Sequence, residues 1–270
     1  MITSRLAPTP SGQLHLGNAL AFGAAWLSAR NVGGRVLLRI EDLDRGRARH
    51  EIAQRQREEL QWLGLDWDAE TPAQSTRQYS TEGVPTYRCT CNRKTRLAGA
   101  CACRDAGLTA GAVRFRCPPG EVCFGDRARG PQVLAPGDDP VLVSADGDPA
   151  YPLAVVLDDA RDGVTEVVRG ADLLDATPAQ IRLHEALSLP VPTYLHVPLL
   201  LGPDGRKLSK SHGSTELGAL RAAGWSPDDV WTTLLPLLGL PAGGLRDARL
   251  EPSRVPCGPF VIDANAVVQP

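Results

Sequence analysis

No stretch of this sequence approaches the ~20 uninterrupted apolar residues that a membrane-spanning helix requires. Residues 1–12 also lack the apolar run of a signal peptide. We therefore expect a cytoplasmic protein that has no membrane partner. The formal net charge is only −2, which excludes a strongly basic nucleic-acid binder but allows a local basic patch. Internal repeats and low-complexity tracts are missing as well.

The composition that is present is ordinary for a soluble globular protein, with 43% hydrophobic and 22% charged residues. The length of 270 residues allows one large domain, or a core with small additions, and nothing points beyond a monomer. One basic cluster stands out, and its pattern is that of either a solvated helix face or a phosphate-contacting surface. Its members are Arg45, Arg47, Arg49, Arg55 and Arg57.

The first part of the chain alternates between strand and helix patterns. Proline and glycine force a turn early on, and apolar residues then recur at helical spacing. Such alternation predicts an α/β domain with a parallel sheet. The expected elements are an extended segment at 5–7, a turn at 8–12, a helix at 16–30, a buried strand at 36–40 and an amphipathic helix at 50–63.

A cysteine-rich segment interrupts this pattern at about residues 87–104, and we interpret it as an inserted module. A strand and turn are expected at 113–124. The α/β pattern resumes at Tyr151 with the apolar run 153–157, and another strand precedes the loop 202–213. Helices should follow around 231–235.

Two separated segments suggest a nucleotide site. In residues 8–18, a tight turn leads into a helix start, where free N–H groups and the helix dipole suit phosphate. His15 would donate to a phosphate oxygen, and Gly17 would allow adenine or ribose to approach the backbone. In residues 207–211, Lys207 and Lys210 could neutralise a departing pyrophosphate. Taken singly, the histidine could equally be a helix cap and the lysine loop merely solvated.

Together the two segments resemble the His-Ile-Gly-His and Lys-Met-Ser-Lys-Ser signatures of class I aminoacyl-tRNA synthetases. The second matches at four of five positions, and Asn18 replaces the last histidine of the first. The resemblance implies a Rossmann-like parallel-sheet catalytic domain and a ligase that uses ATP with Mg²⁺. It assigns catalytic roles to His15, Lys207 and Lys210, and ATP binding to Pro8, His15, Gly17, Asn18 and Lys210.

Three further blocks resemble the glutamate-specific branch of that family: residues 5–12 (RLAPTPSG), residues 39–44 (RIEDLD) and residues 153–170. Glutamate needs cations for its side-chain carboxylate and an anion for its α-ammonium. Arginine offers planar donor forks for the first, and Glu41, just past a buried strand, could pair with the second. The implied glutamate-binding residues are Arg5, Ala7, Thr9, Glu41, Tyr151 and Arg169.

The ordinary alternative makes Arg39 and Glu41 a structural ion pair and leaves Arg169 on the surface. One position departs from the glutamate branch. Val155 stands where longer members carry an asparagine, four residues after the tyrosine. Valine cannot hydrogen-bond the substrate, so we expect a lower affinity for glutamate.

Four cysteines form a Cys-x-Cys…Cys-x-Cys set: Cys89, Cys91, Cys101 and Cys103. Thiolates on two tight turns suit tetrahedral Zn²⁺, and disulfides are not expected in the cytosol. The resemblance implies zinc here but places a tyrosine where Cys101 stands. Cys117 and Cys123 should be buried thiols outside the set.

We expect a catalytic domain of residues 1–86 and 105–213, a zinc-binding insertion of residues 87–104, and a small helical C-terminal region of residues 214–270. Only 59 residues follow Ser211 (270 − 211), so no anticodon-binding domain is expected. In this respect the chain resembles the glutamyl-Q tRNA(Asp) synthetases. Those proteins activate L-glutamate without tRNA and esterify it to queuosine at the wobble position of tRNA(Asp).

Three other functions stay open at this point. One is a truncated glutamate–tRNA ligase that charges a tRNA 3′ end. A second is a non-catalytic zinc-dependent RNA-binding module, which the intact lysine loop and glutamate residues disfavour. The third is a ligase that transfers glutamate to another acceptor.

Overall fold

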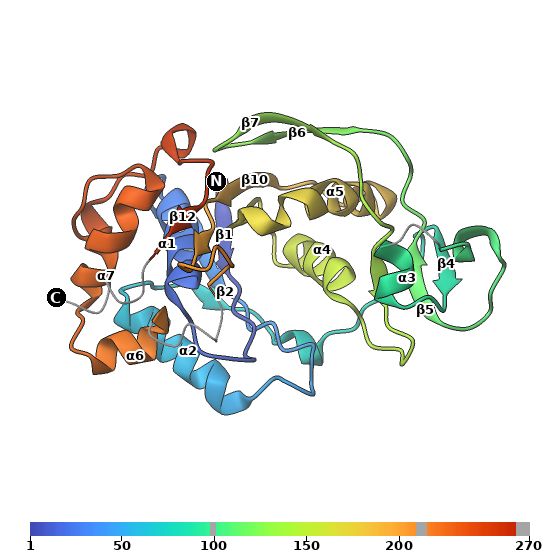
Figure 1. Ribbon diagram of the computed structural model, residues 1–270, viewed down its shortest axis with the longest axis horizontal. Helices are drawn as coiled ribbons and strands as arrows, with labels where there is room; N and C mark the ends of the chain where they lie inside the picture. The colour runs from blue at the N-terminus through green and yellow to red at the C-terminus, as the bar shows by residue number, and fades with distance from the viewer. Residues whose placement is uncertain (98–100, 209–214, 263–270) are drawn as a thin grey trace.

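The computed structural model describes residues 1–97, 101–208 and 215–262. The molecule is elongated, and Figure 1 shows helices α6 (Leu217–Ala222) and α7 (Pro227–Leu234) at one end of its long axis. Strands β4 (Thr86–Cys89) and β5 (Ala112–Phe115) lie at the other end with α3 (Arg93–Leu97). None of the helices in the described residues is long and apolar enough to cross a membrane.

Two sheets with parallel strands form the middle of the molecule. Strands β1 (Thr3–Leu6), β2 (Arg35–Leu38) and β3 (Ala69–Glu70) pair in parallel. The second sheet has the order β7-β6-β10-β9, in which β9 (Glu166–Gly170), β10 (Thr193–Val197) and β6 (Val122–Asp126) run parallel. Strand β7 (Gly130–Leu134) closes an antiparallel hairpin with β6. The Thr165 N–H donates to the Thr3 carbonyl at 2.9 Å, so β1 lies beside the start of β9.

Helix α1 (Leu16–Arg30) is the central helix of this core. Its apolar residues join one buried cluster with Leu38, Val168 and the C-terminal helices, as expected for a helix that covers a parallel sheet. At Gly23 an added Cβ would lie only 2.5 Å from the Trp231 ring, so glycine allows α7 to pack against α1. The predicted α/β fold with parallel strands is therefore confirmed.

The remaining helices largely match the sequence patterns. Helix α2 (His50–Trp62) occupies the expected amphipathic segment. The apolar run 153–157, however, lies inside helix α4 (Tyr151–Arg161) and forms no strand. Helix α5 (Thr177–Ala186) packs beside α4 and follows the 3-10 segment η3 (Ala171–Ala176). A short 3-10 turn, η1 (Gln74–Thr76), follows β3.

The cysteine-rich segment belongs to an antiparallel sheet in which β5 pairs with both β4 and β8 (Val141–Val143). The 3-10 turn η2 (Cys103–Asp105) lies beside β4. Phe115 and Leu142 from this sheet share a buried cluster with Leu153 and Val155 of α4. The sheet thus draws residues from both sides of position 104, and the domain boundaries stay predictions.

The C-terminal region returns to the core. Besides α6 and α7 it contains the 3-10 segments η5 (Leu235–Leu238), η6 (Leu245–Asp247) and η7 (Pro252–Arg254). Strand β12 (Phe260–Val261) pairs in parallel with β11 (Leu200–Leu201). The Trp231 indole donates to the Leu63 carbonyl at 2.8 Å. These contacts join residues from both ends of the chain in one core.

Candidate functional site

A pocket of about 660 Å³ lies between the end of β1 and the start of α1, where parallel sheets place their ligands. Its walls come from the first sequence signature, from α1 and α2, and from the first two residues of the second signature. Among the predicted site residues, the pocket is lined by Ala7, Pro8, Thr9, His15, Asn18 and Lys207.

His15 caps helix α1 through one ring nitrogen. Its Nδ1 accepts from the Gly17 N–H at 3.1 Å, and Asn18 Oδ1 accepts from the His15 N–H at 3.1 Å, which completes a capping box. Burial, together with the charge of Lys207, lowers the pKa of His15 to about 4. The imidazole is therefore neutral at pH 7. Because Nδ1 accepts a hydrogen bond, the ring proton sits on Nε2, which stays a donor for a ligand.

Gly17 does not itself line the pocket, but the His15 ring lies so close to its Cα that a larger residue would crowd it. An added Cβ there would lie 3.0 Å from the His15 ring. Glycine therefore leaves room for the histidine to fold back over the first turn of α1. The cap and the proposed phosphate contact use different nitrogens of the same ring, so the two interpretations of His15 are compatible.

Lys207 also lines this pocket and forms an ion pair with Asp172 of η3. Its side chain is 54% exposed, so that pair can exchange with a ligand phosphate at little cost. Lys210 lies outside the described residues. On either side of that gap Leu208 and Thr215 are buried, and Glu216 forms a backbone bridge with His15.

A second pocket, of about 550 Å³, brings together Thr9, Glu41 and Tyr151. It adjoins the first, because Thr9 and Arg47 line both. Burial raises the pKa of Glu41 above its ordinary value, although Arg39 and Arg5 oppose that shift. A further cation close to a desolvated carboxylate, such as the ammonium of an amino acid, would stabilise the charged form of Glu41.

Two arginines lie behind this pocket without lining either cavity. Arg5 is buried, and its Nε donates to Asp159 Oδ1 at 3.1 Å while Nη1 donates to the Val168 carbonyl at 3.2 Å. Arg169 is only 6% exposed, so the surface interpretation of this residue is wrong. Burial raises the pKa of the Tyr151 phenol, and the charges of Arg169, Glu41 and Arg5 all act on it. These side chains share one electrostatic environment.

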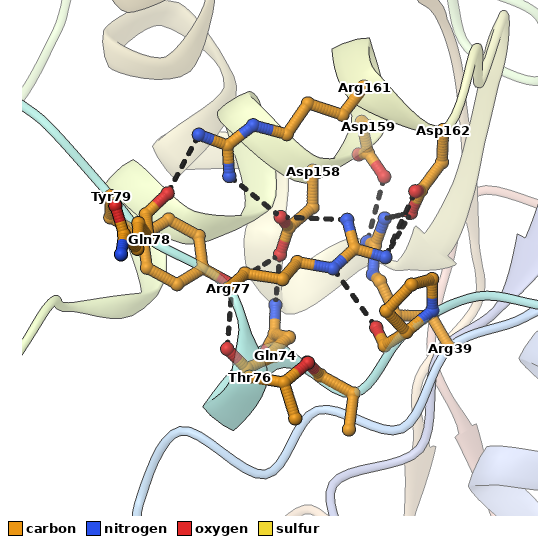
Figure 2. Close-up of polar contacts among 12 residues, drawn as sticks. Arg39, Gln74, Thr76, Arg77, Gln78, Tyr79, Asp158, Asp159, Arg161 and Asp162 are labelled. Atoms are coloured by element: carbon orange, nitrogen blue, oxygen red, sulfur yellow. Dashed lines mark hydrogen bonds and ion pairs between the residues drawn. The ribbon is translucent and has the colours of Figure 1, made fainter.

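Figure 2 shows a network of charged and polar side chains that the sequence patterns did not identify. Asp158 accepts from Arg77 at 3.0 Å, from Gln74 at 2.8 Å and from the Tyr79 hydroxyl at 2.8 Å. Arg77 also pairs with Asp162 at 3.0 Å. The network joins the segment after β3 to α4. Its one visible signal is the Asp158–Asp159 pair directly after the apolar run 153–157.

Arg39 links this network to the pocket. It pairs with Asp159 at 2.8 Å, with Asp162 at 3.2 Å and with Glu41 at 3.3 Å, while itself fully buried. Burial alone would raise the pKa of Asp159, but Arg5 and Arg39 together lower it. The structural Arg39–Glu41 pair is thus present, and it holds Glu41 at the pocket wall.

The four predicted cysteine ligands converge. Their Sγ atoms all lie within 4.8 Å of one another, with 3.7 Å between Cys89 and Cys101 and 3.5 Å between Cys91 and Cys103. Tetrahedral bonds of about 2.3 Å to Zn²⁺ require sulfurs about 3.8 Å apart, so the set could hold such an ion. Among the described residues, no histidine or carboxylate belongs to this group.

The other cysteines behave differently from one another. Cys117 is buried, as predicted, and burial raises the pKa of its thiol to about 11. Cys123 is exposed on β6, so the prediction of a buried thiol there is wrong. In a strand of a sheet with one covered face, neighbouring residues point to opposite faces, and the outward side chain stays in solvent.

Comparison with known proteins places the chain among synthetases. Residues 1–93 and 102–248 match the tRNA synthetases class I (E and Q), catalytic domain. The Glutamyl-Q tRNA(Asp) synthetase of Symbiobacterium thermophilum is 42% identical, over 99% of this chain and 98% of that protein. The one from Nocardia farcinica is 41% identical, over 98% and 94%. A glutamate-tRNA synthetase structure from Elizabethkingia anophelis has the same fold, with a TM-score of 0.81 at 23% identity, covering 98% of this chain and 69% of that one.

Proposed function

The chain belongs to the class I tRNA synthetases and, within them, to the glutamyl-Q tRNA(Asp) synthetases, and we propose that it activates L-glutamate with ATP. The product is glutamyl-adenylate, formed without tRNA. The glutamyl group is then transferred to queuosine at the wobble position of tRNA(Asp). The reaction would take place in the cytoplasm and be carried out by a monomer.

The adjoining pockets are the observation that supports this proposal most directly. One contains His15, Asn18 and Lys207, and the other Glu41 and Tyr151, while Thr9 lies in the wall of both. An amino acid in the second pocket would direct its α-carboxylate at a nucleotide in the first. Two reactants held in neighbouring pockets need little further ordering to react.

We assign glutamate binding to the buried charges. Glu41 would hold the α-ammonium, and Arg5 and Arg169 would supply positive charge and N–H donors for the side-chain carboxylate. Tyr151 and Thr9 would add hydroxyls. Ala7, which lines the first pocket beside Thr9, is also assigned to glutamate binding. ATP would bind to Pro8, His15, Gly17, Asn18 and Lys210.

In the first step, the glutamate α-carboxylate attacks the α-phosphorus of ATP, a P–O bond forms, and pyrophosphate leaves. The Nε2–H of His15 donates to the negative charge that develops on phosphate oxygens. Lys207 and Lys210 are assigned to the leaving pyrophosphate. Bound Mg²⁺ would neutralise phosphate charge.

In the second step, a hydroxyl of the queuosine cyclopentene ring attacks the acyl carbon of glutamyl-adenylate. An ester bond forms, AMP leaves, and the hydroxyl proton passes to the AMP phosphate or solvent. Neither step requires a covalent intermediate with the protein. The four cysteines are assigned one structural Zn²⁺, which would tie β4 to η2.

Transfer of labelled glutamate to tRNA(Asp), with and without queuosine, tests the acceptor. We expect ATP-dependent label only on the modified tRNA, released by mild base as expected for an ester, and recovered in the anticodon fragment rather than the 3′-terminal fragment after nuclease digestion. Label at the 3′ end of unmodified tRNA would identify a truncated glutamate–tRNA ligase instead.

A further inference from the structure

The guanidinium of Arg169 is held by four protein acceptors. Nε donates to His196 Nε2 at 3.1 Å, and Nη1 donates to Gln180 Oε1 at 2.7 Å. Nη2 donates to Thr177 Oγ1 at 2.9 Å and to the Leu173 carbonyl at 3.3 Å. These bonds use four of the five N–H groups of an arginine, so one N–H on Nη1 is left for a ligand.

One of these four acceptors is a histidine side chain, that of His196 on β10, and it is fully buried. Because Arg169 donates to Nε2, the ring proton lies on Nδ1. That nitrogen is 2.6 Å from Asp126 Oδ2. The pKa of His196 lies below its ordinary value, and burial is the largest cause. The charges of Arg169 and Arg129 also lower this pKa, whereas Asp126 raises it. The neutral tautomer therefore joins a carboxylate to a guanidinium.

Asp126 is in turn fixed by the backbone. Its Oδ2 also accepts from the His196 N–H at 3.1 Å, and its Oδ1 accepts from the N–H groups of Ala128 and Arg129 at 3.0 and 2.9 Å. The carboxylate thus caps the turn between β6 and β7. With four donors in place, its position is set by the hairpin rather than by solvent.

From these contacts we propose that Asp126 and His196 are positioning residues that fix the plane of Arg169 and aim its remaining N–H at the carboxylate of the amino-acid substrate. This inference rests on the proposed function of Arg169 in glutamate binding. Neither Asp126 nor His196 lines the substrate pockets. Their effect would pass through Arg169 alone.

The same geometry implies selectivity for a carboxylate. A guanidinium held in one place adds its positive charge to the hydrogen bond, which stabilises a carboxylate more than a neutral amide, and it cannot turn to follow a shorter side chain. If the acceptor at Nε is lost, the guanidinium has a buried unpaired N–H and is free to rotate. Glutamate should then bind more weakly, and glutamine should be excluded less well.

The test uses glutamate-dependent ATP–pyrophosphate exchange with variants of His196. For His196→Leu, which removes both hydrogen bonds, we expect the KM for glutamate to rise about tenfold or more, as loss of one hydrogen bond to a buried charge predicts. The KM for ATP should stay within about twofold. In His196→Gln the amide oxygen can accept from Arg169 while the amide nitrogen donates to Asp126, so most of the glutamate affinity should return.

Asp126→Asn provides a second variant that keeps the volume of the side chain. Its amide would donate to Nδ1, drive the ring proton to Nε2 and set it against the Nε–H of Arg169. We expect the glutamate KM to rise as in His196→Leu. The double variant should be no worse than His196→Leu alone, because both changes act through one contact.

His184→Leu is the matched control, since His184 is also a buried histidine and its ring has no hydrogen bond to Arg169 among the described contacts. A glutamate KM within about twofold of wild type in folded His196→Leu or Asp126→Asn protein would overturn the proposal. So would equal increases in the KM values for glutamate and ATP. Absence of glutamate-dependent exchange in the wild type would instead refute the proposed function.

Discussion

At the scale of single residues, His15 carries two functions on its two ring nitrogens. Nδ1 caps α1, and Nε2 is assigned to phosphate. Asn18, which departs from the family signature, completes the cap through its side-chain oxygen. The departure therefore has a structural explanation in the first turn of the helix.

Two substitutions separate these functions. His15→Asn keeps a side-chain oxygen for the cap but loses the Nε2–H, so we expect normal thermal stability with exchange lowered by about 10²-fold. His15→Ala should lose both, with a further cost of about 1 kcal/mol in the free energy of unfolding. Equal exchange rates in wild type and His15→Asn would contradict the phosphate contact.

The pH dependence follows from the same residue. The pKa of His15 in the folded protein is about 4, against an ordinary value of 6.5. As the pH falls from 6.5 towards 4, His15 takes up a proton in the unfolded chain but stays neutral in the folded protein. Protonation therefore favours the unfolded state, and the free energy of unfolding decreases over this range. His15 should cause no inflection in the exchange rate between pH 6.5 and 8. In His15→Asn the part of the acid sensitivity that arises from His15 should disappear from thermal unfolding curves.

At the scale of elements, the four cysteines show how short turns on one sheet can make a single site. Cys89 is the last residue of β4 and Cys91 follows that strand, while Cys103 begins η2, which lies beside β4. The Arg114 guanidinium lies 3.8 Å from the Cys89 sulfur and 3.9 Å from that of Cys101. A cation there offsets part of the negative charge of thiolate ligands.

Removal of the metal tests this element. We expect about one Zn²⁺ per chain in the wild type, and Cys101→Ser should lower the affinity at least tenfold in competition with a chromogenic chelator. Cobalt substitution should produce the absorption bands of a tetrahedral thiolate site, weakened in the variant. Cys123→Ser is the matched control, because that thiol is exposed and outside the cluster. Unchanged affinity in Cys101→Ser would remove Cys101 from the ligand set.

At the scale of the whole molecule, the arginine cluster divides into paired and unpaired members. Arg47 pairs with Asp44, and Arg57 pairs with Glu70. The Arg49 guanidinium makes no ion pair among the described contacts and donates to the carbonyls of Gly46 and Ala48. It lines a third pocket, of about 420 Å³, beside the loop that bounds the two substrate pockets. A tRNA that reaches the adenylate could pass over this surface.

Arg49→Ala is therefore expected to raise the KM for tRNA and to make its dependence on salt concentration less steep by about 0.7–0.9 in a log–log plot, as for one lost phosphate contact. Exchange without tRNA should be unchanged. Arg249→Ala is a matched control, because Arg249 is exposed and makes the same two kinds of backbone contact, to Arg246 and Ala248. Equal salt slopes for wild type and Arg49→Ala would leave Arg49 as a solvated residue.

The sequence by itself determined the local features of this protein. Helix 16–30, its turn and the four-cysteine set could be predicted because neighbouring residues carry their signals: a capping pattern, a helical period and paired thiols. The glutamate and ATP residues were predicted from motifs of the same local kind. Lys210 is known from its motif alone, since it lies outside the described residues.

Only the tertiary structure decided the helical state of the run 153–157, because a short apolar run has the length of a strand and also fits a buried helix. It also decided which buried polar groups meet. Asp126, Arg169 and His196 come from three strands, and no spacing along the chain indicates that they touch. Burial makes each depend on the others for hydrogen bonds, and this dependence exists only once the strands pair.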